Sequence, residues 1–199
     1  MEIGIESLTE FVLQFDKYLP RRMKIVAIGG TALTLLGKKA STKDVDFCFL
    51  NEQDKAVFVR VAEKLGYKPQ LSNRLIGRGV TIDLYASGYI FCVQLPADYA
   101  KKSIKLKEMQ KIELFALDPL DLLITKAARF NARDKEDIIT IIHSYNIDQK
   151  LLVDRWIKTM ENSMVRDAKE HLRVLLLVFE EHGKADKQAL KKAEGWING

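Results

Sequence analysis

The chain has 199 residues, of which 47% are hydrophobic and 30% charged, values typical of a folded protein with a sizeable core. The formal charge of +5 permits contact with phosphates, but acidic and basic residues alternate, so charge alone does not indicate nucleic-acid binding. The longest apolar run, Val174 to Phe179, is too short to cross a bilayer, and the acidic N-terminus does not resemble a secretory signal. We therefore expect a cytoplasmic protein without a membrane segment.

The first half of the sequence alternates between helical and strand patterns. Apolar residues recur with helical spacing from residue 5 to residue 19, and Gly29-Gly30 marks a turn between a strand and a short helix. The expected elements are a helix over 5–19, a strand over 24–28, a helix over 31–36, a strand over 44–50, a helix over 56–65 and short β-prone segments up to residue 93.

The second half changes to helical sequence after two strand-like pieces between residues 104 and 115. Asp118 and Pro119 have the residue types of an N-cap and a first helical position. The helices expected after them cover 119–130, 135–145, 149–160, 164–181 and 187–194. We predict an α+β fold, with an N-terminal mixed β-sheet flanked by helices over 1–115 and a C-terminal helical bundle over 116–199.

The glycine pair offers a contact for phosphate. Gly29, Gly30 and Thr31 lie between the strand and the helix, where backbone amides without a β-carbon beside them can approach a polyphosphate. A tight turn without a ligand is the common alternative.

Acidic residues on two strands form the second element of the pattern. Asp44 and Asp46 are two apart and therefore share one face of a strand, whereas Val45 and Phe47 point into the core. Asp83 alternates with apolar residues in the run 80–85 and can lie beside the pair. Converging carboxylates repel one another unless a cation neutralises them, so a divalent metal site is one explanation. Solvated positions on strands are the other explanation.

The order of these motifs resembles the DNA polymerase beta-like nucleotidyltransferase superfamily. Ile28-Gly29-Gly30-Thr31, Asp44-Val45-Asp46-Phe47 and Ile82-Asp83-Leu84 carry the resemblance. It implies a nucleotidyltransferase-like N-terminal domain in which the glycine turn and Thr31 bind the nucleotide. It also implies that Asp44, Asp46 and Asp83 are catalytic and bind Mg²⁺ or Mn²⁺, with Asp83 activating an acceptor hydroxyl as well.

A narrower resemblance is to the abortive-infection nucleotidyltransferases, which include toxins of toxin–antitoxin pairs. Thr42-Lys43 is similar to their approach to the metal strand, and the runs 118–126 and 133–137 are similar to their helical motifs. We expect Lys43, in the stretch that leads to the metal strand, to bind the nucleotide. Lys126 lies on the helix face opposite much of the apolar stripe and can reach a triphosphate as a point charge, and Arg133 can grip phosphate oxygens in a fork. The sequence departs from the pattern at 38–40, where Lys38 and Lys39 stand instead of an arginine. Solvation of Lys126 and capping by Asp134 and Asp137 are the structural alternatives.

Other reactive or charged residues receive structural interpretations. The lysines of the run 101–107 can line a nucleic acid, but a charged edge strand is the favoured reading. His143 and His171 are isolated in helical sequence and receive no role. Cys48 and Cys92 have no zinc-like spacing and are expected to be reduced thiols.

We therefore predict a metal-dependent nucleotidyltransferase that moves an NMP from an NTP to a hydroxyl acceptor and releases pyrophosphate. RNA such as tRNA, a protein hydroxyl and a small molecule are all open as acceptors. A non-catalytic nucleotide-binding or interaction module of a toxin–antitoxin-like system is the alternative. The expected partners besides NTP are a cognate antitoxin or a second copy of the chain. An RNA-binding domain is a weaker third reading, because aromatic residues are not interleaved with the basic ones.

Overall fold

The structure is a computed structural model that describes residues 2–199. The chain divides into two compact units. The first contains the residues up to Ile90 together with Ala97–Asp118, and the second contains Phe91–Pro96 and Pro119–Gly199. The boundary expected after residue 115 stays a prediction, and the short segment 91–96 had no feature in the sequence that separated it from its neighbours.

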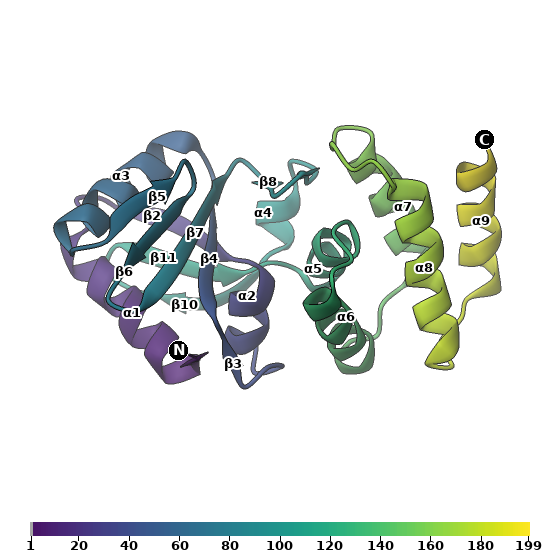
Figure 1. Cartoon of the computed structure of the whole chain (residues 1–199), viewed down its shortest axis with the longest axis horizontal. Coiled ribbons are helices and arrows are strands. Elements are labelled where there is room, and N and C mark those ends of the chain that lie inside the picture. Colours follow the sequence, from purple (N-terminus) through teal and green to yellow (C-terminus); the bar gives the residue numbers. More distant parts are fainter. Residues whose placement is uncertain (1) are drawn as a thin grey trace. The chain divides into compact units, whose positions relative to one another are not determined.

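The first unit is built on a mixed β-sheet, which confirms the predicted fold class (Figure 1). Its strands follow the spatial order β10-β11-β2-β4-β7-β6-β5. A second small ladder joins β1 to β3, and β8 pairs with β7. The strands are β1 (Ile3–Gly4), β2 (Met23–Ala27), β3 (Ser41–Thr42), β4 (Asp44–Phe49), β5 (Lys68–Leu71), β6 (Arg74–Gly77), β7 (Val80–Ala86), β8 (Tyr89–Ile90), β10 (Ile104–Glu108) and β11 (Ile112–Ala116).

The helices of this unit are α1 (Ile5–Tyr18), α2 (Gly29–Leu35), α3 (Glu52–Lys64) and the short α4 (Tyr99–Lys102). Aromatic side chains from α1 and α3 pack on one face of the central strand β4. Phe15 of α1 stacks on Phe58 of α3 with ring centroids 4.3 Å apart, and Phe58 contacts Phe47 and Phe49 of β4. Alternate residues of a strand point to opposite faces, so the even-numbered residues of β4 point away from α1 and α3.

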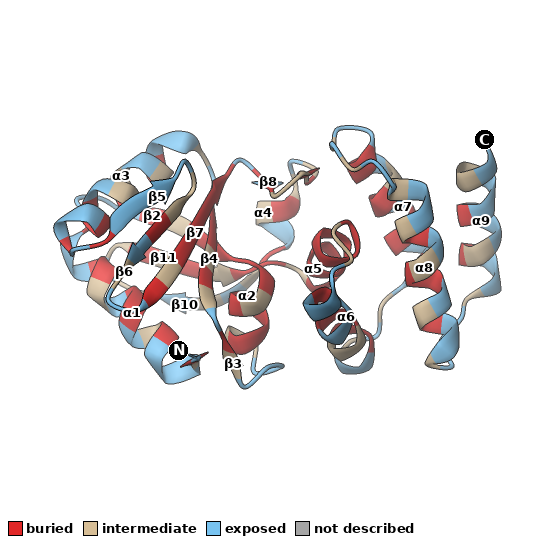
Figure 2. Ribbon diagram, in the orientation of Figure 1, coloured by how far each residue is buried: buried red, intermediate tan, exposed pale blue. Residues whose placement is uncertain are grey.

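The strands in the middle of the sheet are the most buried ones, as Figure 2 shows by their red colour. β2 pairs in parallel with β11 and antiparallel with β4, and β4 pairs in parallel with β7. A buried strand is rich in apolar residues on both faces, as in β2. The polar positions of β4 are therefore exceptions that call for a functional or structural reason.

The edge strand β10 carries the lysines that the sequence had suggested for an edge. Lys105 and Lys107 are exposed, and β10 is the first strand in the order of the sheet. The expectation of a charged edge strand is therefore confirmed. Charged side chains at such an edge discourage pairing with another chain.

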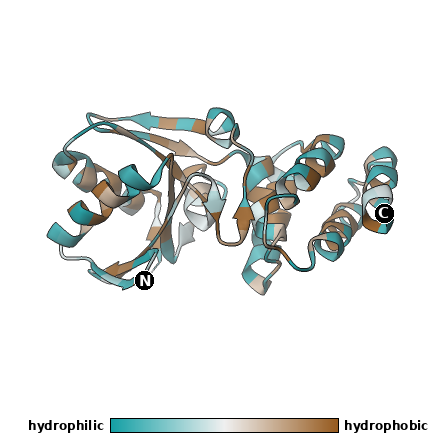
Figure 3. Ribbon diagram, turned by 90° about the horizontal axis from the view of Figure 1, so that it is seen from above, coloured by the Kyte–Doolittle hydropathy of each residue, from teal (hydrophilic) through white to brown (hydrophobic). Residues whose placement is uncertain are grey.

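The second unit is helical. Its helices are α5 (Pro119–Ala127), α6 (Ala132–Ser144), α7 (Gln149–Met160), α8 (Ala168–Glu181) and α9 (Lys187–Asn198), and the short strand β9 (Val93–Gln94) accompanies them. Each of the longer helices carries both hydrophobic and hydrophilic residues (Figure 3). Trp156 is fully buried, and the buried pair Arg155–Asp121, with nitrogen–oxygen distances of 2.5 and 2.6 Å, ties α7 to α5.

One expectation for the second unit is wrong. Asp134 does not cap α6 through its side chain, because Asn131 is the N-cap and its Oδ1 accepts a hydrogen bond from the Asp134 backbone N–H. His143, which received no role from the sequence, has its Nε2 3.0 Å from Nδ1 of His182, a contact that helical periodicity alone does not single out. None of the helices within residues 2–199 combines the length and the apolar character that a membrane crossing requires.

Candidate active site

The candidate site is built on the paired strands β4 and β7. These strands run in parallel with Asp44 opposite Thr81 and Asp46 opposite Asp83. Residues that face each other in a parallel pair point to the same side of the sheet, so the three carboxylates share one face. It is the face opposite α1 and α3. The two carboxylates of β4 are partly exposed, whereas Asp83 is only 4% exposed.

Asp83 is held by an arginine that the sequence analysis did not identify. Arg74 donates from Nε to Oδ1 and from Nη2 to Oδ2 of Asp83, both over 2.7 Å. The hydrogen bonds to Asp83 and its negative charge raise the pKa of the Arg74 guanidinium above its ordinary value, and the charge of Asp44 adds to this effect. Asp83 is therefore a buried, paired carboxylate, and the solvated-strand interpretation of this residue is wrong.

The register of the β6–β7 hairpin places Arg74 opposite Asp83. β6 and β7 are joined by Arg78 and Gly79, which both have positive φ, as a two-residue type I′ turn requires. Counting outward from that turn leads from the pair Gly77–Val80 to the pair Arg74–Asp83. The signal in the sequence is the glycine-containing turn 77–80 between two β-prone runs, because the register of the hairpin follows from that turn.

The glycine pair begins helix α2 and is not a separate turn before it. Gly29 has φ of +56°, and a Cβ added there would lie 3.1 Å from Oδ2 of Asp46. A Cβ at Gly30 would lie only 2.7 Å from Oγ1 of Thr42. Both glycines are therefore required by contacts within the chain. The expectation that their missing side chains serve a phosphate is untested, but internal packing already accounts for them.

Thr31 connects α2 to the acidic strand. Its hydroxyl donates to the carbonyl of Asp44 over 3.0 Å and accepts from the backbone N–H of Asp46 over 2.9 Å. Thr42 also donates to the Asp44 carbonyl, over 3.1 Å. Because Thr31 is fully buried and its hydroxyl bonds to backbone on both sides, it positions the strand. Its expected contact with nucleotide stays a prediction.

The three basic residues expected to bind nucleotide have different surroundings. Lys43 is exposed and directly precedes Asp44. Arg133 is exposed on α6 of the second unit. Lys126 is only 3% exposed, and its ammonium lies 2.5 Å from Asp137 and 3.4 Å from Asp134. The solvated interpretation of Lys126 is wrong, and its ion pairs give it a structural role in joining α5 to α6.

The carboxylates can be tested against the needs of a divalent cation. Mg²⁺ takes oxygen ligands and commonly uses one or two carboxylates together with substrate phosphates. Asp44 and Asp46, co-facial and partly exposed, fit that requirement. Over residues 2–199 no group of three or more acidic, histidine or cysteine side chains is arranged to hold a metal, and both oxygens of Asp83 accept from Arg74. The assignment of Asp83 as a metal ligand stays a prediction.

Comparison with solved structures supports the architecture. An antigenic nucleotidyltransferase-like protein from Paracoccidioides brasiliensis is similar with a TM-score of 0.55 and 13% identity, over 96% of this chain and 95% of that chain. ANT(2″)-Ia, solved in complex with adenylyl-2″-tobramycin, is similar with a TM-score of 0.52 and 12% identity, over 89% of this chain and 97% of that chain. At these identities the likeness shows the fold alone.

Comparison at the level of sequence identifies the family. No curated protein gives a significant match to the chain. The model of a family described as nucleotidyltransferase of unknown function (DUF6036) matches residues 5–187. That match includes both acidic strands, the glycine pair and most of the second unit. The chain therefore belongs to the DUF6036 family of nucleotidyltransferases.

Proposed function

We propose that this protein transfers an NMP from an NTP to a hydroxyl acceptor in a reaction that depends on a divalent cation. The observation that carries the proposal is the register of β4 and β7, which sets Asp46 opposite Asp83 with Asp44 on the same face. Membership of a nucleotidyltransferase family supports the reaction class. The proposed cation is Mg²⁺ or Mn²⁺.

Asp44 and Asp46 would hold the cation. When bound, the cation supplies charge neutralisation for the phosphate oxygens. Asp83 accepts the proton of the acceptor hydroxyl, while the acceptor oxygen forms a bond to the α-phosphorus and the bond to the pyrophosphate oxygen breaks. Pyrophosphate leaves with the electron pair of that bond. The chain's own contribution is to fix the carboxylates before substrate arrives, through the ladder and the hydroxyl of Thr31.

The proposed phosphate contacts are Lys43 and the start of α2. Lys43 is exposed beside Asp44, so its ammonium can reach a triphosphate as a flexible point charge. Gly29, Gly30 and Thr31 supply the first backbone N–H groups of α2, a position where helices leave donors without an intrahelical acceptor. The expectation that Arg133 binds nucleotide stays a prediction from the sequence; this residue is exposed on α6, whereas the Lys126 ammonium is held by two buried carboxylates.

One observation favours a second candidate, a non-catalytic nucleotide-binding or interaction module of a toxin–antitoxin-like system. Arg74 engages both oxygens of Asp83, the carboxylate to which we give the proton-accepting role. If that pair never opens, Asp83 offers only its remaining lone pairs to an acceptor. A nucleotide-binding module would differ from the enzyme in turnover alone, and a pure interaction module would lack NTP affinity as well.

The test is transfer of label from each of the four NTPs, labelled in the α-phosphate, with Mg²⁺ or Mn²⁺ present. The acceptors are total tRNA, total cellular protein and tobramycin, the last because adenylyl-tobramycin is bound to the structural neighbour. We expect the parent chain to label one acceptor class. Asp46→Asn should remove the labelling, and Glu113→Gln on β11 should keep it. Absence of transfer in every arm, with NTP binding intact, would favour the non-catalytic module.

A further inference from the structure

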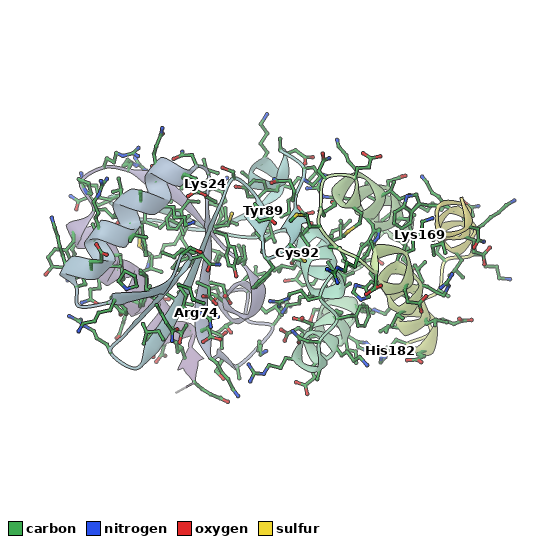
Figure 4. The ribbon with its side chains drawn as sticks, turned by 45° about the horizontal axis from the view of Figure 1, so that its top comes forward. Lys24, Arg74, Tyr89, Cys92, Lys169 and His182 are labelled. Carbon is green, nitrogen blue, oxygen red and sulfur yellow. The ribbon has the colours of Figure 1, made fainter. Side chains whose placement is uncertain are left out.

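The acid cluster, which we define as Asp44, Asp46 and Asp83, contains its own counter-cation. Arg74 reaches it from the neighbouring strand β6, and its register position is directly opposite Asp83 (Figure 4 labels Arg74). Its guanidinium also interacts electrostatically with Asp44. Carboxylates that share one face of adjacent strands repel one another, so a cation held beside them by hydrogen bonds lowers that repulsion.

The two members of the Arg74–Asp83 pair differ in their access to water. The side chain of Asp83 is 6% exposed, whereas that of Arg74 is 39% exposed. If the pair breaks, the buried carboxylate of Asp83 needs a new partner, whereas water can solvate the guanidinium of Arg74. Asp83 is therefore the member of the pair that needs a replacement partner if the pair opens, whereas Arg74 does not.

The position of Arg74 suits such an exchange. β6 lies in the outer part of the sheet, between β7 and the edge strand β5, all of whose residues are exposed. The guanidinium is anchored through the two hydrogen bonds to Asp83, and a long flexible side chain can turn toward solvent without moving the strand. No rearrangement of the β4–β7 ladder is needed.

We propose that Arg74 is the resident counter-cation of the acid cluster and that a divalent cation competes with it for Asp83. This inference rests on the proposed function, because it takes Asp44 and Asp46 as the first ligands of that cation. When the cation binds, Asp83 exchanges its hydrogen bonds from Arg74 for the added positive charge, and Arg74 becomes available to solvent or to phosphate. Arg74 is a positioning residue for the metal site, and it sets how readily the site loads.

Competition between Arg74 and the cation for Asp83 predicts a measurable change in cation affinity. If Arg74 is clamped on Asp83 in about nine-tenths of the molecules, the apparent affinity for the cation is reduced about tenfold. Arg74→Met removes the competing charge while keeping a long apolar side chain. We therefore expect this variant to bind Mn²⁺ about tenfold more tightly than the parent chain. Arg74→Lys keeps a charge without the two-pronged geometry and should fall between the two.

The experiment is a calorimetric Mn²⁺ titration of the full chain and its variants, with no nucleotide present. Arg78→Met is the matched control, because Arg78 is exposed at the turn of the same hairpin. Tighter binding by Arg74→Met, parent-like binding by Arg78→Met and loss of binding in Asp46→Asn would support the proposal. Equal or weaker binding by folded Arg74→Met, while the parent binds through Asp46, would overturn it and leave the proposed function standing. Lack of binding by every chain would overturn the exchange, because no cation would then compete for Asp83 in the nucleotide-free chain, and the label-transfer test would still decide the proposed function.

A measurement on the unmutated chain decides the matter if Arg74→Met does not fold. The Nε–H group of Arg74, hydrogen-bonded to Asp83, should give a signal of its own in nitrogen-15 spectra of arginine-labelled protein, assigned by its loss in Arg74→Lys. Saturating Mg²⁺ should shift that signal, and Asp46→Asn should abolish the shift. A signal that Mg²⁺ leaves unchanged, while backbone signals of β4 move, would show that the Arg74–Asp83 pair persists beside the bound cation and would overturn the exchange.

Discussion

The backbone N–H of Asp46 donates a hydrogen bond to the hydroxyl oxygen of Thr31 over 2.9 Å. The same hydroxyl donates to the carbonyl of Asp44, so one buried side chain satisfies backbone groups on both sides of Val45. The first turn of α2 is thereby attached to the strand that carries the acidic pair. Residues of the glycine motif and of the acidic motif are parts of one hydrogen-bonded unit.

Thr31→Val should destabilise the fold. The substitution keeps the shape but leaves a buried N–H and a buried carbonyl with one partner fewer, which costs about 1–3 kcal/mol. Thr31→Ser keeps the hydroxyl and should cost less. The free energy of unfolding from urea denaturation distinguishes them. If the valine variant were as stable as the serine variant, the hydroxyl would not be what joins α2 to β4.

Gly30→Ala should be destabilising because of Thr42. The added Cβ would lie 2.7 Å from Thr42 Oγ1, closer than real Cβ contacts. Thr42→Ala removes that oxygen and, alone, costs its hydrogen bond to Asp44. In the double variant the losses should not add, and the coupling should be about 0.5–3 kcal/mol. A double-mutant cycle on unfolding free energies measures it. Strict additivity would mean that Gly30 is needed for another reason, such as approach of a ligand.

Asp83→Asn should separate binding from turnover. The side chain keeps its size, and Arg74 still has one acceptor oxygen, so we expect the fold and most of the NTP affinity to remain. Loss of the proton acceptor should lower the rate of NMP transfer by about 10²–10⁴-fold. The measurement is single-turnover transfer to the acceptor class that the parent labels, with NTP affinity determined in parallel. Parent-like transfer would remove the role that we give to Asp83.

The pH dependence of stability should change above pH 9 because of Cys48. Burial raises the pKa of the Cys48 thiol to about 11 from its ordinary value of 9.0. The folded chain therefore holds this proton where the unfolded chain has lost it, so stability that is complete below about pH 9 falls as the pH rises toward 11. Urea unfolding at about pH 8 and about pH 10.5 should show a loss of roughly 2 kcal/mol from this group.

Cys48→Ala is the comparison for that measurement and should lose less stability over the same interval. Some loss should remain, since burial also raises the pKa of Tyr99, whose hydroxyl lies 3.8 Å from the Cys48 sulfur. If the stability of Cys48→Ala depended on pH as that of the parent does, the loss could not be assigned to the Cys48 thiol. Cys92→Ala, at a partly exposed position, serves as the control.

The sequence predicted the elements well because their signals are local. Periodicity gave the strand over 44–50 and the helix over 149–160, and the structure has β4 and α7 within a residue of those limits. Alternation also gave the shared face of Asp44 and Asp46, since it follows from strand geometry alone. The family match agrees with the resemblance that these motifs carried, at the level of the nucleotidyltransferases.

Partners across elements were harder to predict. Arg74 and Lys126 are both cations whose roles depend on which carboxylates the fold brings to them. Lys126 resembled a phosphate ligand because its motif did, yet Asp137 lies 2.5 Å from its ammonium. Pairing between helices depends on packing, which a single sequence does not specify. The Arg74–Asp83 pair was accessible in principle, because hairpin register follows from the turn.

The β4–β7 ladder has a consequence for how this protein tolerates change in length. Asp46 faces Asp83 because backbone hydrogen bonds hold that register, and a slip by one residue would present Ile82 or Leu84 instead. Residues inserted between the two strands leave the acid cluster intact as long as the ladder re-forms. The exposed tip of the β5–β6 hairpin, at Ser72, is thus a point where a peptide can be added without altering the spacing of the carboxylates.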